Sequence, residues 1–239
     1  MVKMAQKWAA DYMAKNSGVS ISVKGGGSGT GIAAIINGTV TFANSSRDLK
    51  PEEVAQGQAK GEDLKATEVA KDGIAIVVNK ANTVSELTTT QVGAIYRGEI
   101  TNWKQLGGAD KAIVLLSRDN TSGTYEFVKE KVIGKTKEFA KTTKLLSSTQ
   151  QIVDGVKSSP DAIGYVGIGY VTPDLKVIKL DGMIPQIADV QNGTYVLSRG
   201  LFMVHNGEPA GVNKAYLDWI LGPEGQAVVK AEGFVPLGK

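Results

Sequence analysis

The sequence predicts an α/β protein with a mixed, largely parallel sheet. Two features of the 239-residue chain predict this class. Segments with an apolar residue at every second position, which is typical of strands, alternate along the chain with segments of helical period. In addition, polar loops rich in glycine and hydroxyl residues stand between the end of an expected strand and the start of an expected helix, as in parallel α/β units.

The first expected element is an amphipathic helix over 1–15, whose apolar residues recur four positions apart: Met4, Trp8 and Tyr12. A strand is expected at 19–25, where apolar and polar residues alternate. A short helix at 30–37 follows a glycine-rich loop, and the glycine after this helix suits a C-terminal cap. A strand is expected next, at 40–44.

The rest of the chain continues the alternation. Proline marks the first turn of one helix, Thr88 and Gln91 have the spacing of a capping box in the next, and Gly222-Pro223 separates the last two. The expected helices cover 51–60, 88–98, 125–132, 148–156, 210–221 and 223–231, and the expected strands cover 64–73, 74–79, 112–118, 162–167 and 195–204.

The composition excludes several kinds of site. The chain contains no cysteine, which excludes disulfides, zinc–thiolate sites, iron–sulfur clusters and a cysteine nucleophile. His205 is the single histidine, so a two-histidine metal site is excluded and any Ser-His-Asp triad would have to use this residue. The net charge of +3 is mild and no five like charges run together, so nucleic acid is not an expected partner.

The N-terminal residues do not resemble a targeting segment. The longest apolar runs, Ile74–Val78 and Leu201–Val204, are far shorter than the roughly 18 residues of a membrane-spanning helix. Residues 1–15 lack the uninterrupted apolar stretch of a signal peptide. Because the first helix starts at residue 1 without a cap, we expect the natural gene product to extend further toward the N-terminus.

Two loops share a design suited to anions. GGGSGTG at 25–31 and RDNTSGTYEF at 118–127 each place glycines and hydroxyls between a strand and a helix. Glycine lets backbone amides approach a ligand, and a helix N-terminus adds unpaired donors and partial positive charge. The hydroxyl donors are Ser28, Thr30, Ser122 and Thr124, and Arg118 offers a planar fork that matches two oxygens of a tetrahedral anion. A third loop, NSSRDL at 44–49, presents Ser45, Ser46, Arg47 and Asp48.

Each feature also has a simpler interpretation. A Gly-Ser-Gly-Thr string alone is often only a flexible turn, and Arg118 alone could be a solvated or salt-bridged arginine. The first loop does not match the Walker A motif, because Ile32 follows Gly31 where lysine is required, and it does not match GxGxxG, because Thr30 or Ile32 occupies the final glycine position. It also fails the GxSxG pattern of hydrolases, since Thr30 occupies the last glycine position.

The residues resemble a known family, the phosphate-binding proteins of bacterial and archaeal ABC importers. The resemblance covers essentially the whole chain and rests on these strings in the family's order: VSISVKGGGSGTGIAAIINGTVTFANSSRDL, GAIYRGEITNW, SRDNTSGTYEF, AIGYVG and EGFVPLGK. It implies a two-lobed type II periplasmic-binding-protein fold with mixed sheets and two crossover strands, which holds the anion in a cleft. Lobe one is then expected at 1–78 plus 199–239, and lobe two at 79–198.

The resemblance also implies a set of phosphate ligands. Ser28 is similar to the hydroxyl donor of the family's first glycine-rich loop, and the family's phosphate clamp matches Arg118, Ser122, Gly123 and Thr124. The full candidate set adds Thr30 and Ser46, with Gly29, Arg47 and Asp48 as further candidates. No cofactor and no catalytic residue is expected.

The sequence departs from the family pattern at two places. Some members carry an aspartate where this chain has Ser46, and that carboxylate accepts the proton of hydrogen phosphate, so Asp48 or an acidic residue in an upstream segment would have to do so here. Family members also normally begin with a strand and a Gly/Ser/Thr loop, which would lie before Met1. Their absence is expected to leave an unpaired edge beside 19–25, to weaken phosphate binding and to permit a strand-exchanged dimer.

The leading functional hypothesis is an extracytoplasmic solute-binding protein, in the periplasm or lipid-anchored at the cell surface, that captures inorganic phosphate for the membrane permease of an ABC transporter. The alternatives are a binding protein for sulfate, molybdate or tungstate, and a phosphate sensor that uses the same site. An enzyme such as a phosphatase would need Ser122 or Thr124 as nucleophile beside a base, and His205 shows no sign of serving them.

Overall fold

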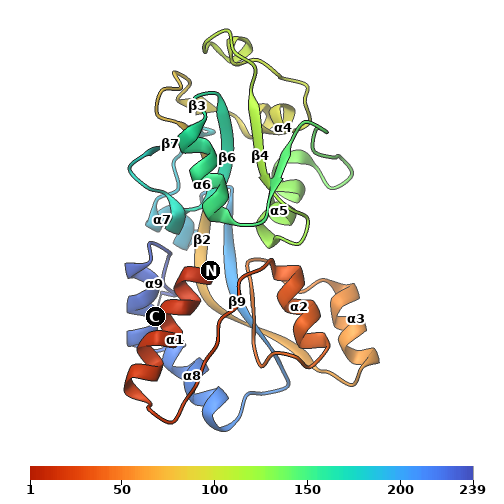
Figure 1. Cartoon of the computed structure of the whole chain (residues 1–239), viewed down its shortest axis with the longest axis vertical. Helices are drawn as coiled ribbons and strands as arrows, with labels where there is room; N and C mark the ends of the chain where they lie inside the picture. Colours follow the sequence, from red (N-terminus) through yellow and green to blue (C-terminus); the bar gives the residue numbers. More distant parts are fainter. Residues whose placement is uncertain (239) are drawn as a thin grey trace. The chain divides into compact units, whose positions relative to one another are not determined.

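The computed structural model describes residues 1–238 and divides the chain into two compact units. Unit 1 consists of Met1–Asp72 and Arg199–Lys239, and unit 2 of Gly73–Ser198. The chain therefore passes twice between the units, within β2 (Leu64–Asn79) and at the start of β9 (Ser198–Asn206). Both units are mixed α/β structures, as the sequence predicts (Figure 1).

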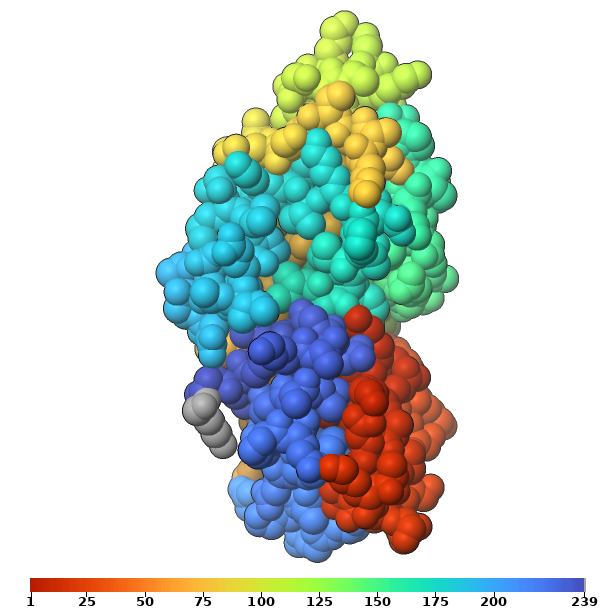
Figure 2. All heavy atoms as spheres, turned by 90° about the vertical axis from the view of Figure 1, so that its left-hand side faces the viewer, coloured from red at the N-terminus to blue at the C-terminus, as the bar shows by residue number. Residues whose placement is uncertain are grey.

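In unit 1, three helices pack together around aromatic side chains. These helices are α1 (Val2–Lys15), α8 (Gly211–Leu221) and α9 (Pro223–Ala231). The indole N–H of Trp8 donates to the Gly225 carbonyl at 2.8 Å, and the Tyr12 ring lies edge-on to Tyr216 at 5.0 Å. Figure 2 shows α1, in red, against the blue C-terminal helices. One face of α1 is thus buried along successive turns because its aromatic stripe meets an aromatic surface.

A second layer of unit 1 holds the first glycine-rich loop. Here α2 (Ser28–Ile36) packs its isoleucines against β1 (Ala43–Ser45), Leu64 and Val204, and α3 (Pro51–Ala59) lies beside α2. Strand β1 pairs antiparallel with β9, with Ala43 opposite Val204, and β9 neighbours β2. The N-terminus of α2 and the end of β1 are fixed by this packing.

Unit 2 is built on the central strand β6 (Ala162–Gly167). This strand is antiparallel to β2, with Ile74 opposite Gly167, and parallel to β4 (Val114–Arg118), which is in turn parallel to β5 (Lys144–Leu146). Strand β7 (Leu175–Val177) pairs with the other edge of β2. Helix α6 (Thr149–Ser158) packs its apolar side onto this sheet through Ile152, Val153 and Val156.

The remaining elements of unit 2 are short. Strands β3 (Glu86–Leu87) and β8 (Lys179–Leu180) form a small parallel pair. The helical elements are α4 (Thr89–Tyr96), α5 (Gly123–Val128), α7 (Ile187–Asn192), and the turns η1 (Trp103–Leu106), η2 (Lys129–Ile133) and η3 (Ile168–Tyr170).

Four expected elements differ in the structure. The strand pairing is also not largely parallel as predicted, because β1–β9, β2–β6 and β2–β7 pair antiparallel, whereas β4–β5, β4–β6 and β3–β8 pair parallel. Residues 19–25 form no strand: their side chains alternate between half-buried and exposed, but no other segment of residues 1–238 forms a ladder with them. The strand-exchanged dimer, which the sequence predicts from an unpaired edge beside this segment, stays a prediction. The segments expected as two strands at 64–73 and 74–79 are one continuous strand, β2. The expected helix at 125–132 is α5 followed by the π-helical turn η2.

The boundaries at the two crossings have a local explanation. Gly73 already lies against unit 2, because a Cβ there would come within 2.6 Å of Val190 and 3.0 Å of Pro185, and Ile74–Val78 pair with β6. The first passage between the units therefore follows Asp72, whereas the sequence expectation placed it after residue 78. Strand β9 begins at Ser198, later than expected, because the Ser198 amide donates to the Tyr195 carbonyl at 3.0 Å and closes a turn.

Candidate functional site

A first group of predicted site residues lies in unit 1, where β1 ends and α2 begins. Ser28 is the first residue of α2 and is buried. Its hydroxyl oxygen accepts from the Ser46 amide at 3.0 Å and lies 3.4 Å from the Ser46 hydroxyl. A hydroxyl that accepts an amide can still donate its own proton. The structure thus brings Ser28 and Ser46 together at a helix N-terminus, where donors and partial positive charge suit an anion.

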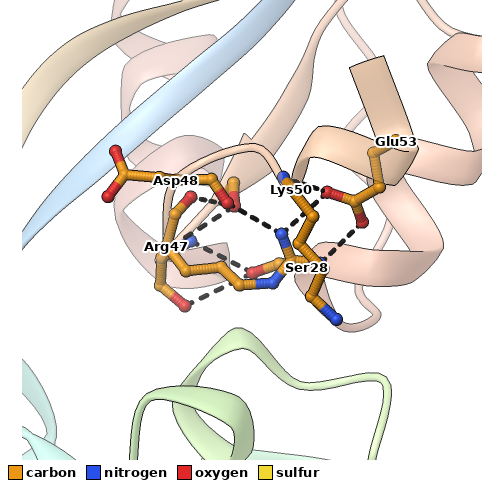
Figure 3. A network of polar contacts seen from close by, with 7 residues as sticks. Ser28, Arg47, Asp48, Lys50 and Glu53 are labelled. Carbon is orange, nitrogen blue, oxygen red and sulfur yellow. Dashed lines mark hydrogen bonds and ion pairs between the residues drawn. The ribbon is translucent and has the colours of Figure 1, made fainter. Parts of the chain in front are cut away.

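The loop that carries Ser46 is held by an ion pair between Arg47 and Glu53 (Figure 3). The two Nη atoms of Arg47 donate to the two carboxylate oxygens of Glu53 at 2.9 and 2.7 Å, and the Lys50 amide donates to Glu53 at 2.9 Å. Burial acts to raise the pKa of Glu53, but the hydrogen bonds from Arg47 and Lys50 and the charge of Arg47 outweigh it, so this pKa lies below its ordinary value. Arg47 therefore orders the loop.

The other candidates of this group are more exposed than Ser28. Thr30 is exposed in the first turn of α2, and its side chain faces Gly26. Gly29 lies between Ser28 and Thr30 in that turn and is half-buried. Asp48 is exposed, and Figure 3 shows its carboxylate pointing away from the Ser28 hydroxyl. Asp48 is therefore badly oriented to accept a proton from a ligand held at Ser28.

A second group lies in unit 2 and begins with Arg118, the last residue of β4. Its side chain is buried, with 6% of the residue exposed. The guanidinium donates to the Leu146 carbonyl at 3.1 Å, the Ser147 carbonyl at 2.9 Å and the Thr149 hydroxyl at 3.0 Å. Hydrogen bonds from Nε and both Nη atoms fix the plane of the fork, and a fixed fork can bind two oxygens of one anion.

Ser122, Gly123 and Thr124 complete the second group at the start of α5. All three are buried. Ser122 caps the helix, because its hydroxyl accepts from the amides of Thr124 at 3.2 Å and Tyr125 at 3.4 Å. The amide of Ser122 donates to the Asp119 carbonyl at 3.1 Å, and this turn joins the cap to Arg118. Hydrogen bonds therefore hold the end of β4, the turn and the start of α5 together.

Sequence reasoning missed several residues that support these groups. Thr149 accepts from Arg118, and the buried Tyr165 hydroxyl lies 2.5 Å from the Ser117 hydroxyl and accepts from the Arg118 amide at 3.3 Å. Burial raises the pKa of Tyr165 despite these hydrogen bonds, so its hydroxyl stays neutral. A signal for Thr149 was present, since it begins a helix directly after the hydroxyl residues Ser147 and Ser148. No comparable signal marks Tyr165 or Glu53.

The single histidine has a structural environment in unit 1. The Nδ1 atom of His205 lies 2.7 Å from the Gly207 carbonyl and Nε2 lies 2.8 Å from the Thr67 hydroxyl. Among residues 1–238, no three side chains of the types that bind metals come together. Nor does any helix in that range have the length and apolar character needed to cross a membrane.

Comparison with known proteins identifies the family. Residues 2–224 match the model of the PBP superfamily domain. The phosphate-binding protein PstS of Staphylococcus epidermidis is 33% identical, over 98% of this chain and 74% of that protein. The Bacillus subtilis PstS is 31% identical, over 96% of this chain and 75% of that protein.

Solved structures agree in fold over the whole chain. A substrate-binding protein of Clostridium perfringens, crystallised with bound phosphate, has a TM-score of 0.93 and 34% identity, covering 99% of this chain and 96% of that one. An ABC-type phosphate transport receptor of Vibrio cholerae has a TM-score of 0.78 and 29% identity, covering 98% and 95%. The predicted two-lobed periplasmic-binding-protein fold is thereby confirmed. This chain belongs to the PBP superfamily and, within it, to the PstS family of phosphate-binding proteins.

Proposed function

We propose that the chain captures inorganic phosphate and delivers it to the membrane permease of an ABC importer. The observation that carries this proposal is the likeness to the Clostridium perfringens protein, which was solved with phosphate bound and matches this chain over nearly its full length. The two groups of anion donors supply the chemistry. Such a protein acts outside the cytoplasmic membrane, where the permease receives its solute.

Each group has a specific role in the proposal. In unit 1, the hydroxyls of Ser28, Thr30 and Ser46 and the amide of Gly29 donate to phosphate, while Arg47 orients the loop. In unit 2, Arg118 supplies charge and a planar fork, and Ser122, Gly123 and Thr124 supply hydroxyl and amide donors. The hydrogen bonds in place support these assignments, because Ser28 and Ser122 each accept backbone amides and so hold their hydroxyl groups in fixed positions.

Binding without catalysis is part of the proposal. A serine nucleophile needs an adjacent base to take its proton. The hydrogen bonds that the structure gives the Ser122 hydroxyl come from backbone amides of its own helix, which is a capping arrangement. The names of the two PstS relatives and of the Clostridium perfringens protein also describe binding proteins.

Sulfate is the second candidate ligand. Hydrogen phosphate carries a proton that a carboxylate can accept, whereas sulfate has none and is repelled by a carboxylate. The exposed, outward-pointing carboxylate of Asp48 favours neither ion at Ser28. A site that used only hydroxyl and amide donors would discriminate less between the two anions.

Isothermal titration with phosphate, sulfate, molybdate and a phosphate monoester tests the proposal. We expect phosphate to bind most tightly and the monoester to remain unhydrolysed in a parallel assay. Tighter binding of sulfate or molybdate than of phosphate would contradict phosphate as the solute. Hydrolysis that is lost in Ser122→Ala would contradict a purely binding role.

A further inference from the structure

The positive charge of this chain is concentrated in one short stretch of unit 2. Residues 129–144, here called the basic segment, contain two glutamates and six lysines: Lys129, Lys131, Lys135, Lys137, Lys141 and Lys144. The segment therefore has a formal charge of +4. Because the whole chain has a net charge of +3, all other residues together sum to −1. The basic segment is the source of the positive charge of the entire molecule.

The basic segment is held in place by aromatic contacts. The ring of Phe139 stacks on Tyr125, with the ring centres 4.6 Å apart, and lies edge-on to Tyr96 at 5.6 Å. The Ala140 amide donates to the Tyr96 carbonyl at 2.7 Å. The lysines on either side of this anchor are consequently displayed from a fixed backbone.

Three of the six lysines are exposed and have no ion-pair partner among residues 1–238. Within the described part of the chain, Lys137, Lys141 and Lys144 form no ion pair, and all three are exposed. The others pair inside the segment, Lys129 with Glu138 at 2.6 Å and Lys131 and Lys135 with Glu130 at 3.9 and 3.7 Å. The field of Lys137 reaches outside the segment, since it helps to lower the pKa of Glu99.

An exposed apolar residue comes next to the last of these lysines in the chain. Leu145 follows Lys144 in the edge strand β5 and is 55% exposed, the largest value among the exposed large apolar residues. An anionic bilayer offers both phosphate charges for lysines and an apolar interior for a leucine. A soluble polyanion offers only the first of these.

We propose that the basic segment, together with Leu145, is a docking surface for an anionic phospholipid bilayer. The chemistry of the patch favours a bilayer over a protein partner, because lysine is depleted at protein–protein interfaces, where arginine and aromatic residues dominate. Flexible ammonium groups instead suit a diffuse layer of charged headgroups, to which each lysine near the surface contributes about fivefold in affinity. Docking would keep a phosphate carrier close to membrane-embedded partners.

The docking surface uses residues other than those of the anion site. Strand β5 runs parallel to β4, with Lys144 opposite Leu116 and Leu146 opposite Arg118. Arg118 is the last residue of β4 and its partner Ser147 directly follows β5, whereas the basic segment ends at Lys144, the first residue of β5. Lysine substitutions in the segment leave every proposed phosphate ligand unchanged, so vesicle binding can be measured separately from phosphate binding.

Vesicle co-sedimentation of the full chain tests the proposal. The vesicles consist of phosphatidylcholine alone or mixed with phosphatidylglycerol, at low and at high salt. The test variant is Lys137→Gln/Lys141→Gln/Lys144→Gln. The matched control is Lys80→Gln/Lys111→Gln/Lys179→Gln, which removes three exposed charges of unit 2 outside the segment. Leu145→Ser tests the apolar contact, and circular dichroism confirms that each variant is folded.

We expect binding only to phosphatidylglycerol-containing vesicles, weakened by salt because surface charges are screened. The test variant should bind on the order of a hundredfold more weakly, the control should lose much less, and Leu145→Ser should bind measurably more weakly than the parent chain. Absence of vesicle binding at low salt would overturn the proposal, as would equal losses in the test and control variants. Undiminished vesicle binding by Leu145→Ser, with equally tight binding to soluble polyphosphate, would identify a polyanion rather than a bilayer as the occupant.

Discussion

The Arg47–Glu53 pair shows how single side chains prepare the anion site. Both side chains are largely buried, with 10% and 13% of their surfaces exposed, and two parallel hydrogen bonds join them. Such a bidentate pair is among the stronger ionic contacts in proteins. Since Arg47 follows Ser46 directly, the pair fixes the backbone amide that donates to Ser28.

Removing the Glu53 charge should destabilise unit 1 in a pH-dependent manner. Because the pKa of Glu53 is depressed in the folded chain, its stabilisation is fully present above the unfolded value of 4.5 and is lost as pH falls through the lower folded value. Glu53→Gln should lower the free energy of unfolding by about 1–2 kcal/mol at neutral pH. Urea unfolding between neutral pH and about pH 3 measures this difference, which should vanish at the acidic end.

Glu52→Gln, on the exposed side of the same helix, is the control for this experiment. It should leave the free energy of unfolding nearly unchanged across the pH range. A Glu53→Gln difference that persisted at acidic pH would contradict the ionic origin of the effect.

Residues whose roles depend on local sequence were predictable, and those that depend on distant partners were not. Ser28 and Ser122 were predicted because each hydroxyl lies in a polar loop directly before a helical pattern, which places it at the helix N-terminus even though no strand precedes Ser28 in the structure. Arg47 was predicted as a possible ligand, and the structure gives it Glu53 as partner. Tyr165 contacts Arg118 only because β6 lies beside β4. The local sequence around either residue does not predict this pairing of strands.

At the scale of elements, the two strands that pass between the units are joined by a buried ion pair. Arg199 in β9 donates to Asp72 in β2 from Nη2 at 2.8 Å and from Nε at 3.2 Å. The exposed fractions of the two side chains are 6% and 1%. Both residues lie at the boundary of unit 1, so the pair fixes the two strands where the chain leaves that unit.

Breaking this pair should be costly because it removes the carboxylate charge that faces the buried Arg199 guanidinium. Asp72→Asn should lower the free energy of unfolding by about 3–5 kcal/mol. Urea unfolding followed by circular dichroism measures the loss. Asp110→Asn, which removes a carboxylate from an exposed pair with Lys104, is the control and should have little effect. Equal losses in the free energy of unfolding would show that the buried pair contributes no more to stability than the exposed pair.

The aromatic layer of unit 1 should depend strongly on α1. Trp8 is fully buried and its indole N–H is bonded to Gly225. Trp8→Ala should cost about 3–5 kcal/mol in the free energy of unfolding, whereas Trp8→Phe should lose less because it keeps most of the apolar volume. Lys7→Ala, on the exposed face of α1, is the control. Thermal and urea unfolding measure these changes, and a stability loss in Trp8→Ala no larger than in Lys7→Ala would contradict the packing.

Periodicity predicted most helices and strands, but it did not decide whether a segment finds a partner. Residues 19–25 and β2 both contain the apolar pattern of strands. Strand β2 forms because β6 and β7 pair with its backbone. Residues 19–25 show the same alternation of apolar and polar residues, but no strand of the described chain pairs with them. Pairing is a property of the tertiary fold, so the sequence of one segment cannot determine it.

At the scale of the whole molecule, each unit carries its own group of anion donors. Ser28 and Ser46 belong to unit 1, and Arg118, Ser122 and Thr124 belong to unit 2. Each group places hydroxyls where the end of a strand lies beside the start of a helix, namely β1 and α2 in unit 1 and β4 and α5 in unit 2. If both groups bind phosphate, as we propose, a change in either unit alone should weaken binding.

Titration calorimetry with phosphate on matched variants tests this central claim most directly. Ser28→Ala removes a hydroxyl of unit 1, and Arg118→Lys removes the planar fork of unit 2 while keeping the charge. The control is Arg97→Lys, a second arginine of unit 2 that pairs with Glu99 at 2.7 Å. We predict that Ser28→Ala and Arg118→Lys each weaken phosphate binding at least about tenfold, as expected for the loss of a hydrogen bond to a charged ligand, and that Arg97→Lys binds like the parent chain. Parental affinity in either Ser28→Ala or Arg118→Lys would contradict the assignment of that unit's group to phosphate.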